Sequence, residues 1–143
     1  MKTPGPDHPI TITPNPRQVR VRFQDHVIAA SFNVLTLKEA DYPPVHYFPR
    51  ADVETGFISK TTHHTNCPYK GDASYFTFYM NGDMLENAVW SYETPYPAME
   101  QIKDMLAFYP DKFEVYEIDE ADIEDRHRPA FSEAWPAADS GAQ

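Results

Sequence analysis

The chain has 143 residues, with 12 Lys and Arg, 22 Asp and Glu, a single Cys and a formal net charge of -10. This length predicts one domain, and 41% hydrophobic with 14% aromatic residues is typical of a folded protein. The acidic balance argues against a duplex nucleic-acid binder, and no apolar run approaches the roughly 20 residues of a membrane span. A lone cysteine and the lack of an apolar N-terminal segment predict a cytoplasmic location.

The negative charge is concentrated at the C-terminal end. Residues 113–143 hold nine acids and two bases, a balance of -7, whereas residues 1–112 carry only -3. A segment so acidic and poor in aliphatic residues cannot bury enough apolar surface to offset its chain entropy, so we predict an acidic, largely mobile tail at 119–143. Phe131 and Trp135 leave open a second possibility, in which the tail docks on the body or on a partner subunit.

Proline marks the other end of the chain. Five of the first sixteen residues are proline, which removes backbone donors and favours extended structure. We therefore expect a flexible Pro-rich arm at 1–8, and a single β-rich domain at 9–118.

Alternating residues predict the first strands of this domain. Apolar and polar residues alternate over 19–23, a turn is expected at 24–26, and residues 27–31 complete a β-hairpin. Residues 33–37 add a further strand. The segment 42–49 contains three prolines and is expected to be irregular or extended.

A second hairpin is the clearest local signal. The aromatic run 73–80 leads into Asn81-Gly82, the favoured pair for a tight type I′ turn, and a partner strand then runs towards Trp90 and Tyr92. Because successive strand residues point to opposite faces, one face is expected to be apolar and the other to carry hydroxyl groups. The first face holds Phe76, Phe78 and Met80, and the second holds Tyr75, Thr77 and Tyr79.

One main helix is predicted near residues 97–108. Pro97 suits a first helical turn, apolar residues recur at helical spacing after it, and Pro110 stops its continuation. Alternation over 113–118 predicts a last strand. Many strands and little strand–helix alternation indicate a mainly β (β-rich α+β) fold with antiparallel sheets.

Residues 60–71 form the most unusual polar segment. They contain two lysines, two histidines, a thiol and three threonines, with no acid before Asp72. Lys60 and Lys70 could contact a phosphate or carboxylate, to which Thr61 and Thr65 could donate hydroxyl hydrogen bonds. The alternative is an ordinary solvated turn.

Cys67 lies within this segment and has three interpretations. Lys70 and a nearby histidine could lower the pKa of its thiol and make it a nucleophile, or it could be a small buried hydrophobic residue. With His46, His63 and His64 it also offers zinc-ligand types, but adjacent strand histidines face opposite ways and no second Cys completes a C-x-x-C pair. We expect no metal or other cofactor.

Four segments, 44–50, 65–73, 88–92 and 108–111, resemble in order and spacing the family known as domain of unknown function 427. The resemblance covers about residues 17–118, and its most specific strings are Tyr-Phe-Pro and Cys-Pro-Tyr-Lys-Gly. It implies a tent-like fold in which two antiparallel sheets lean together over a pocket. The family also carries a nucleotidyltransferase-like label, but this chain lacks the Gly-Ser and paired-Asp motif of ordinary nucleotidyltransferases.

These observations favour a small domain that binds an anionic or cyclic molecule in an aromatic-walled pocket. Its alternatives are an enzyme, either nucleotidyltransferase-like or thiol-dependent through Cys67, and a protein interaction module. A homodimer is compatible with exposed strand edges. The candidate ligand-binding residues are Trp90, Tyr92 and Tyr75 as walls, Lys70, Arg50 and Lys60 towards an anionic group, Thr61, Thr65 and Tyr47 for orientation, and Tyr69.

Overall fold

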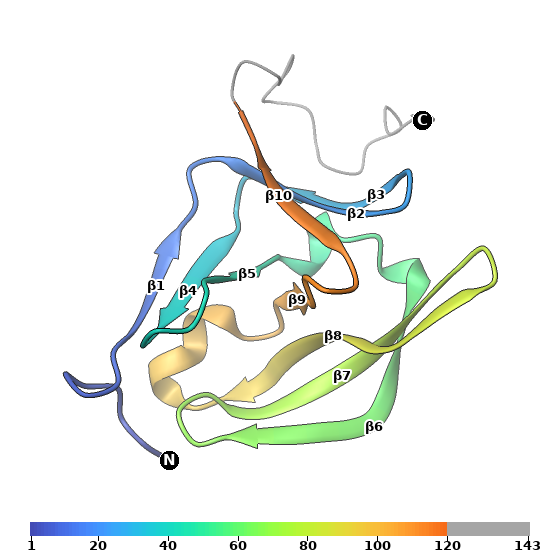
Figure 1. Ribbon diagram of the computed structural model, residues 1–143. Helices are drawn as coiled ribbons and strands as arrows, with labels where there is room; N and C mark the ends of the chain where they lie inside the picture. The colour runs from blue at the N-terminus through green and yellow to red at the C-terminus, as the bar shows by residue number, and fades with distance from the viewer. Residues whose placement is uncertain (120–143) are drawn as a thin grey trace.

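The computed structural model describes residues 1–119, and in that range the chain forms ten strands and three short 3-10 helices (Figure 1). The strands are β1 (Ile10–Pro14), β2 (Gln18–Phe23), β3 (His26–Ser31), β4 (Leu35–Glu39), β5 (Val45–Tyr47), β6 (Ile58–Cys67), β7 (Gly71–Met80), β8 (Asp83–Pro95), β9 (Leu106–Phe108) and β10 (Glu114–Ile118). The 3-10 helices are η1 (Arg50–Asp52), η2 (Thr55–Phe57) and η3 (Pro97–Ile102).

The strands form three sheets, and all pairings within them are antiparallel. The small sheet has the order β1-β4-β5, the terminal sheet β10-β2-β3 and the large sheet β6-β7-β8-β9. The predicted mainly β class with antiparallel sheets is therefore confirmed. The described residues form three sheets where two were expected. The third arises because β10 pairs with β2 and so extends the first predicted hairpin, β2–β3, into a separate sheet.

The large sheet is organised by the predicted second hairpin. Asn81 and Gly82 join β7 to β8 with positive φ angles of 52° and 88°, as a type I′ turn requires. Register shifts interrupt the β6–β7 and β7–β8 pairings, and such bulges bend a strand. Near these bulges the Thr61 hydroxyl donates to the side-chain Oδ1 of Asn87 at 2.7 Å, and the backbone N–H of Asn87 donates to Thr77 Oγ1 at 3.1 Å.

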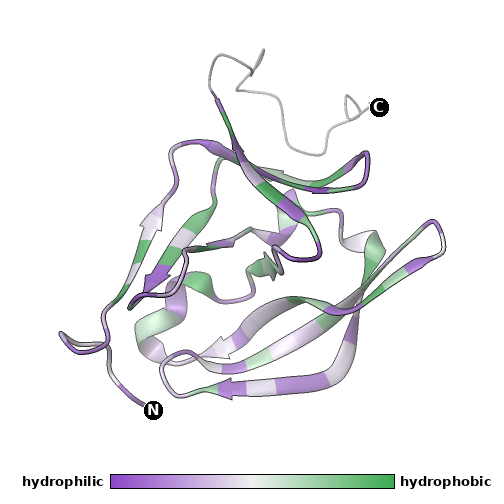
Figure 2. Cartoon of the chain, viewed as in Figure 1, coloured by the Kyte–Doolittle hydropathy of each residue, from purple (hydrophilic) through white to green (hydrophobic). Residues whose placement is uncertain are grey.

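Both faces of the large sheet carry buried apolar side chains. Phe76 and Phe78 point into the main core, whereas Tyr75 and Tyr92 belong to a second cluster on the opposite face, here called the pocket-side cluster. The edge strand β6 is mostly hydrophilic and exposed (Figure 2). The main core is built by Val19, Val21, Ile28, Val34, Phe48, Phe76, Phe78, Val89, Leu106, Phe108 and Phe113, among others.

Two local predictions are corrected by the structure. Residues 60–71 are not a solvated turn, because most of them belong to β6, which pairs with β7. The helix expected near 97–108 is a 3-10 helix that ends at Ile102 and has a non-helical residue, Met99, inside it. Beyond it, β9 pairs with β8 and is fully buried, so sheet pairing prevails over helical spacing there.

The arm at residues 1–8 lies against the body in the structure. The Lys2 amide donates to the Pro68 carbonyl at 2.7 Å, and Gly5 and His8 exchange backbone hydrogen bonds. Its flexibility in solution stays a prediction. Apart from Asp119, the tail predicted at 119–143, with Phe131 and Trp135, lies outside the described residues.

Gly71 provides a test of how β7 begins. Its φ is +108°, and a Cβ there would lie 3.3 Å from the Thr94 carbonyl oxygen, so Gly71→Ala should lower the free energy of unfolding by about 1–3 kcal/mol. Gly56→Ala is the matched control, because a Cβ at Gly56 meets nothing within 4 Å. Urea unfolding of both variants measures the difference. Equal stability of the two would contradict this account of the turn.

Candidate binding pocket

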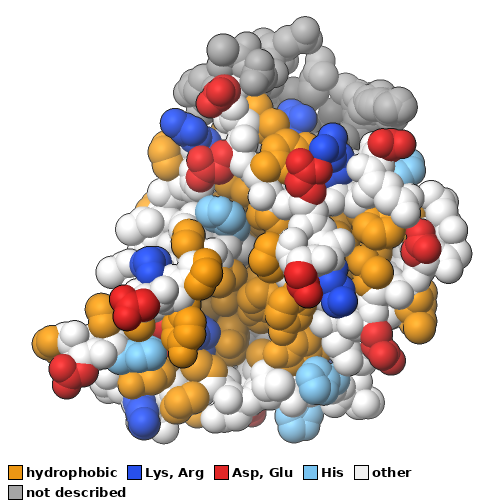
Figure 3. Space-filling model, in the orientation of Figure 1, with side chains coloured by type: hydrophobic (Ala, Val, Ile, Leu, Met, Phe, Trp, Pro, Cys, Tyr) orange, Lys and Arg blue, Asp and Glu red, His pale blue; other side chains and the backbone are white. Residues whose placement is uncertain are grey.

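A pocket of about 270 Å³ lies between side chains of the small sheet and of the large sheet. Figure 3 shows hydrophobic side chains gathered around a hollow in the middle of the face that it displays. The loop after β4 and the residue after β9 complete the lining. The lining residues are Leu37, Glu39, Tyr42, Pro43, Val45, Tyr47, Lys70, Tyr75, Trp90, Tyr92 and Tyr109.

Aromatic side chains form most of the walls. Tyr75 and Trp90 are directly paired across β7 and β8, so their side chains share the pocket face of the sheet. The Trp90 ring lies 4.5 Å from the Tyr109 ring and 6.4 Å from the Tyr47 ring, measured between centroids. The Trp90 indole Nε1 donates to the Tyr47 hydroxyl at 3.4 Å. These contacts hold the Trp90, Tyr47 and Tyr109 rings in defined orientations.

Three phenols of the pocket, those of Tyr47, Tyr92 and Tyr109, are held in the neutral form by a raised pKa. Burial raises the pKa of Tyr47 and of Tyr92 well above the ordinary value. Burial and then a hydrogen bond with Tyr75 raise the pKa of Tyr109. The Tyr75 hydroxyl also lies 2.9 Å from Thr65 Oγ1. Because a neutral phenol can both donate and accept, the pocket offers both kinds of hydrogen bond.

An ion pair stands at the pocket lining. Lys70, only 8% exposed, donates from Nζ to Glu39 Oε1, and its ammonium lies 6.0 Å from the centroid of the Tyr92 ring. The second carboxylate oxygen, Glu39 Oε2, is 2.7 Å from His8 Nε2. Burial alone would raise the pKa of Glu39, but the hydrogen bonds from Lys70 and His8 outweigh it and hold that pKa below its ordinary value. Glu39 is therefore ionised at neutral pH.

Five of the proposed ligand-binding residues meet at this pocket. They are Tyr47, Lys70, Tyr75, Trp90 and Tyr92. Thr65 reaches it indirectly, through its hydrogen bond to Tyr75, and Tyr69 stacks on His8 with ring centroids 4.1 Å apart. Cys67 is half-buried and packs against the pocket-side cluster.

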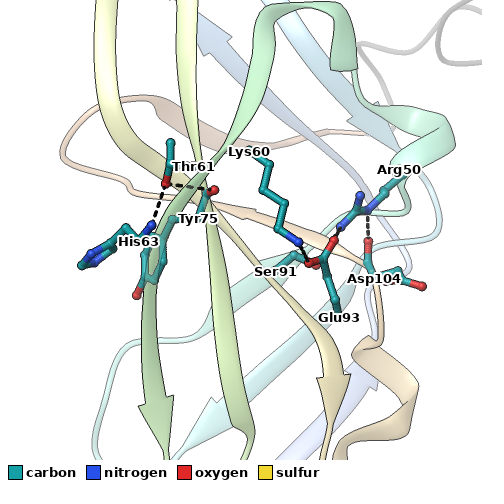
Figure 4. Close-up of polar contacts among 8 residues, drawn as sticks. All are labelled: Arg50, Lys60, Thr61, His63, Tyr75, Ser91, Glu93 and Asp104. Carbon is teal, nitrogen blue, oxygen red and sulfur yellow. Dashed lines mark hydrogen bonds and ion pairs between the residues drawn. The ribbon is translucent and has the colours of Figure 1, made fainter.

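Arg50 and Lys60 gather elsewhere, around Glu93 (Figure 4). Lys60 Nζ lies 2.7 Å from Glu93 Oε1, and Arg50 Nη2 lies 3.1 Å from Glu93 Oε2. Lys60 is paired with Phe76, which faces the main core, so this cluster lies on the opposite face of the large sheet from Trp90. Burial would raise the pKa of Glu93, but hydrogen bonds from Lys60, Ser74 and Arg50 lower it overall. These two cations are thus already neutralised in part by Glu93.

Thr61 and His46 are not among the residues that line the pocket. The Thr61 hydroxyl lies 3.4 Å from the Tyr75 carbonyl oxygen (Figure 4), besides its bond to Asn87. The His46 Nδ1 is 2.9 Å from Thr36 Oγ1, and burial lowers the pKa of His46. Among residues 1–119, no three His, Cys, Asp or Glu side chains are placed to hold a metal ion.

Sequence reasoning missed several lining residues, above all Glu39. Leu35, Leu37 and Glu39 share one face of β4, since they are two residues apart. An acid in phase with inward-facing leucines is the signal that could have identified it. Tyr109 and Tyr42 were also missed, because each stands next to a proline-rich or loop segment where no strand pattern assigns a face.

Comparison with protein families gives a match that covers most of the chain. Residues 11–119 match the sequence profile of a family described as Domain of unknown function (DUF427). No curated protein matches the chain. In the described part of the chain, no helix has the length and apolar character that crossing a membrane requires.

The buried phenols predict a specific alkaline behaviour. Because folding raises the pKa of Tyr47, Tyr92 and Tyr109 above the ordinary value of about 10, their contribution to folding stability is complete below pH 10 and is lost as the pH rises further. A tyrosinate absorbance titration should show these phenols ionising only together with unfolding. In Tyr47→Phe, the absorbance change that accompanies unfolding should be smaller by the contribution of one phenol. Reversible ionisation of Tyr47 near pH 10 in the folded protein would contradict the prediction.

Proposed function

For this chain, which belongs to the domain of unknown function 427 family, we propose a role as a binding domain for a small ring-bearing molecule that carries an acidic group. The single observation behind this proposal is the meeting of an aromatic-walled pocket with a nearly buried lysine at its lining. Small-molecule sites are usually concave and mostly apolar, with a small number of polar groups that fix the orientation of the ligand.

The size and walls of the pocket support a flat ligand. A volume of about 270 Å³ lies just below the usual range of about 300–1,000 Å³ for ligand sites, which suits a molecule of one or two rings. Trp90, Tyr75 and Tyr109 offer ring faces and edges, and aromatic pairs gain about 0.5–1.5 kcal/mol beyond the area that they bury. Their fixed orientation lowers the entropy cost of binding.

Lys70 supplies the feature that selects an acidic group. An ammonium of such low exposure is poorly hydrated, so a carboxylate or phosphate that reaches it forms a charge-assisted hydrogen bond of higher strength than in water. Neutral phenols beside it can orient the same group by donating further hydrogen bonds. Arg50 and Lys60 are left out of this proposal, because both contact Glu93 on the other face of the sheet.

An enzymatic function is the second candidate. It is favoured by the position of Cys67, which is half-buried and packs against the pocket-side cluster. In that case a bound ligand would be consumed, and Cys67→Ser would abolish turnover without abolishing binding. Turnover that persists in Cys67→Ser would remove the thiol-dependent reaction.

The binding proposal is tested by NMR titration with a panel of small molecules. The panel contains benzoate, its neutral counterpart benzamide, nucleoside monophosphates and sugar phosphates. We expect at least one acidic member to shift the Trp90 indole resonance and the amide of Lys70. Lys70→Met should weaken the binding of that member by about tenfold or more, since a charge-assisted hydrogen bond is lost.

Lys60→Met is the matched control, because it removes an equal charge from the opposite face. It should leave the affinity unchanged within about twofold, the size of a distant surface-charge effect. The proposal fails if no member of the panel shifts the Trp90 resonance. It fails equally if Lys60→Met and Lys70→Met weaken binding to the same extent.

A further inference from the structure

Glu39 divides its two oxygens between two different partners. Oε1 accepts from the Lys70 ammonium, and Oε2 lies 2.7 Å from His8 Nε2. The three groups come from separate parts of the chain, since Glu39 ends β4, Lys70 precedes β7 and His8 belongs to the N-terminal arm. An ionised carboxylate can only accept, so Nε2 of His8 carries the proton of this hydrogen bond. The Nδ1 atom is then the position at which a further proton would bind.

His8 is held in place without any help from Lys70. Its ring stacks on the Tyr69 ring with centroids 4.1 Å apart and planes within 8°. Its backbone exchanges hydrogen bonds of 3.0 and 3.3 Å with Gly5, and the next residue, Pro9, accepts from the Ala40 amide at 2.8 Å. The partner on Oε2 would therefore stay where it is if the partner on Oε1 were lost.

This geometry matters for any acidic ligand. Lys70 is the only cation that lines the pocket in the described residues, and its charge is already balanced by Glu39. A second anion placed at Lys70 would leave two negative groups beside one positive group in a poorly solvated site, which is strongly unfavourable. Binding is favourable only if Glu39 finds another positive partner.

We propose that Glu39 is an internal counter-ion, which an acidic ligand displaces from Lys70 and which His8 then retains by taking up a proton. The inference rests on the proposed function and deepens it, because it assigns to the pocket a ligand with one anionic group. In the exchange, the hydrogen bond from Lys70 to Glu39 breaks and one from Lys70 to the ligand forms. A proton from solvent binds Nδ1 of His8, so the total charge of the site stays balanced.

Other titratable or charged groups lie around Glu39 and His8. Tyr47 and Tyr92 are neutral phenols on the pocket side, as their raised pKa values require. Tyr69 stacks on His8, and the Lys2 ammonium lies 5.9 Å from the centroid of the Tyr69 ring. Lys2 is therefore a cation in addition to Lys70, and it belongs to the same arm as His8, so variants of His8 are needed to assign the proton uptake to the imidazole.

The experiment uses the full chain with benzoate as the acidic probe and benzamide as the neutral one. Calorimetry in two buffers of different ionisation enthalpy counts protons taken up on binding. In the wild type we expect benzoate to bind with proton uptake, and therefore with an affinity that falls as the pH rises. Glu39→Gln should bind benzoate about tenfold more tightly at neutral pH, because the competing carboxylate is gone, and without proton uptake.

His8→Gln should bind benzoate more weakly than the wild type and without proton uptake. The matched control is His26→Gln, which changes an exposed histidine at the start of β3 and should preserve both affinity and uptake. The wild-type proton count needs no variant, so it tests the proposal even if a substitution impairs folding.

The outcomes separate this inference from the proposed function. If benzoate binds the wild type without proton uptake, or if Glu39→Gln lowers the affinity for benzoate, the counter-ion role is overturned and the proposed binding function is retained. If benzamide binds and benzoate does not, the counter-ion role is again overturned. If neither probe shifts the Trp90 resonance and the panel also fails, both are overturned.

Discussion

The contact between Glu39 and Lys70 is the interaction on which the pocket depends. It joins the end of β4 in the small sheet to the residue that precedes β7 in the large sheet, and both side chains line the pocket. Removing one member of this part-buried pair should destabilise the protein, because the other charge is left without its partner in a site with little solvent. The same pair contributes little net stability compared with apolar residues, which points to a role in the site rather than in the fold.

The large sheet makes such a site possible because both of its faces are used. One face closes the main core, and the other carries the aromatic walls of the pocket, with Tyr75 and Trp90 paired across the strands. Bulges in β6, β7 and β8 bend the sheet near Thr61 and Asn87, where hydrogen bonds join the strands. The two clusters of charge lie on opposite faces of this sheet, with Lys70 on the pocket side and Lys60 on the other.

Local patterns predicted the parts of this arrangement that depend on local physics. The β7–β8 hairpin follows from Asn81-Gly82 and from two-residue alternation. Tyr75, Trp90 and Tyr92 were proposed as walls because aromatic rings with a polar end suit a pocket rim, and all three line the pocket. The helix after Pro97 was too long in the prediction, because its spacing carries no information about the β8–β9 pairing. Glu39 and His8 were missed, since their contacts span 31 residues and depend on how two sheets and the arm meet.

The most direct test is a crystal structure of the full chain grown with benzoate. The account predicts the benzoate ring between Trp90 and the neighbouring tyrosines, its carboxylate within hydrogen-bond distance of Lys70 Nζ, and Glu39 turned away from Lys70 but still bonded to His8 Nε2. Benzoate seated at Lys70 with the Glu39–Lys70 contact intact would contradict the exchange of counter-ions. Benzoate bound at Arg50 and Lys60, with the pocket empty, would contradict the assignment of the site itself.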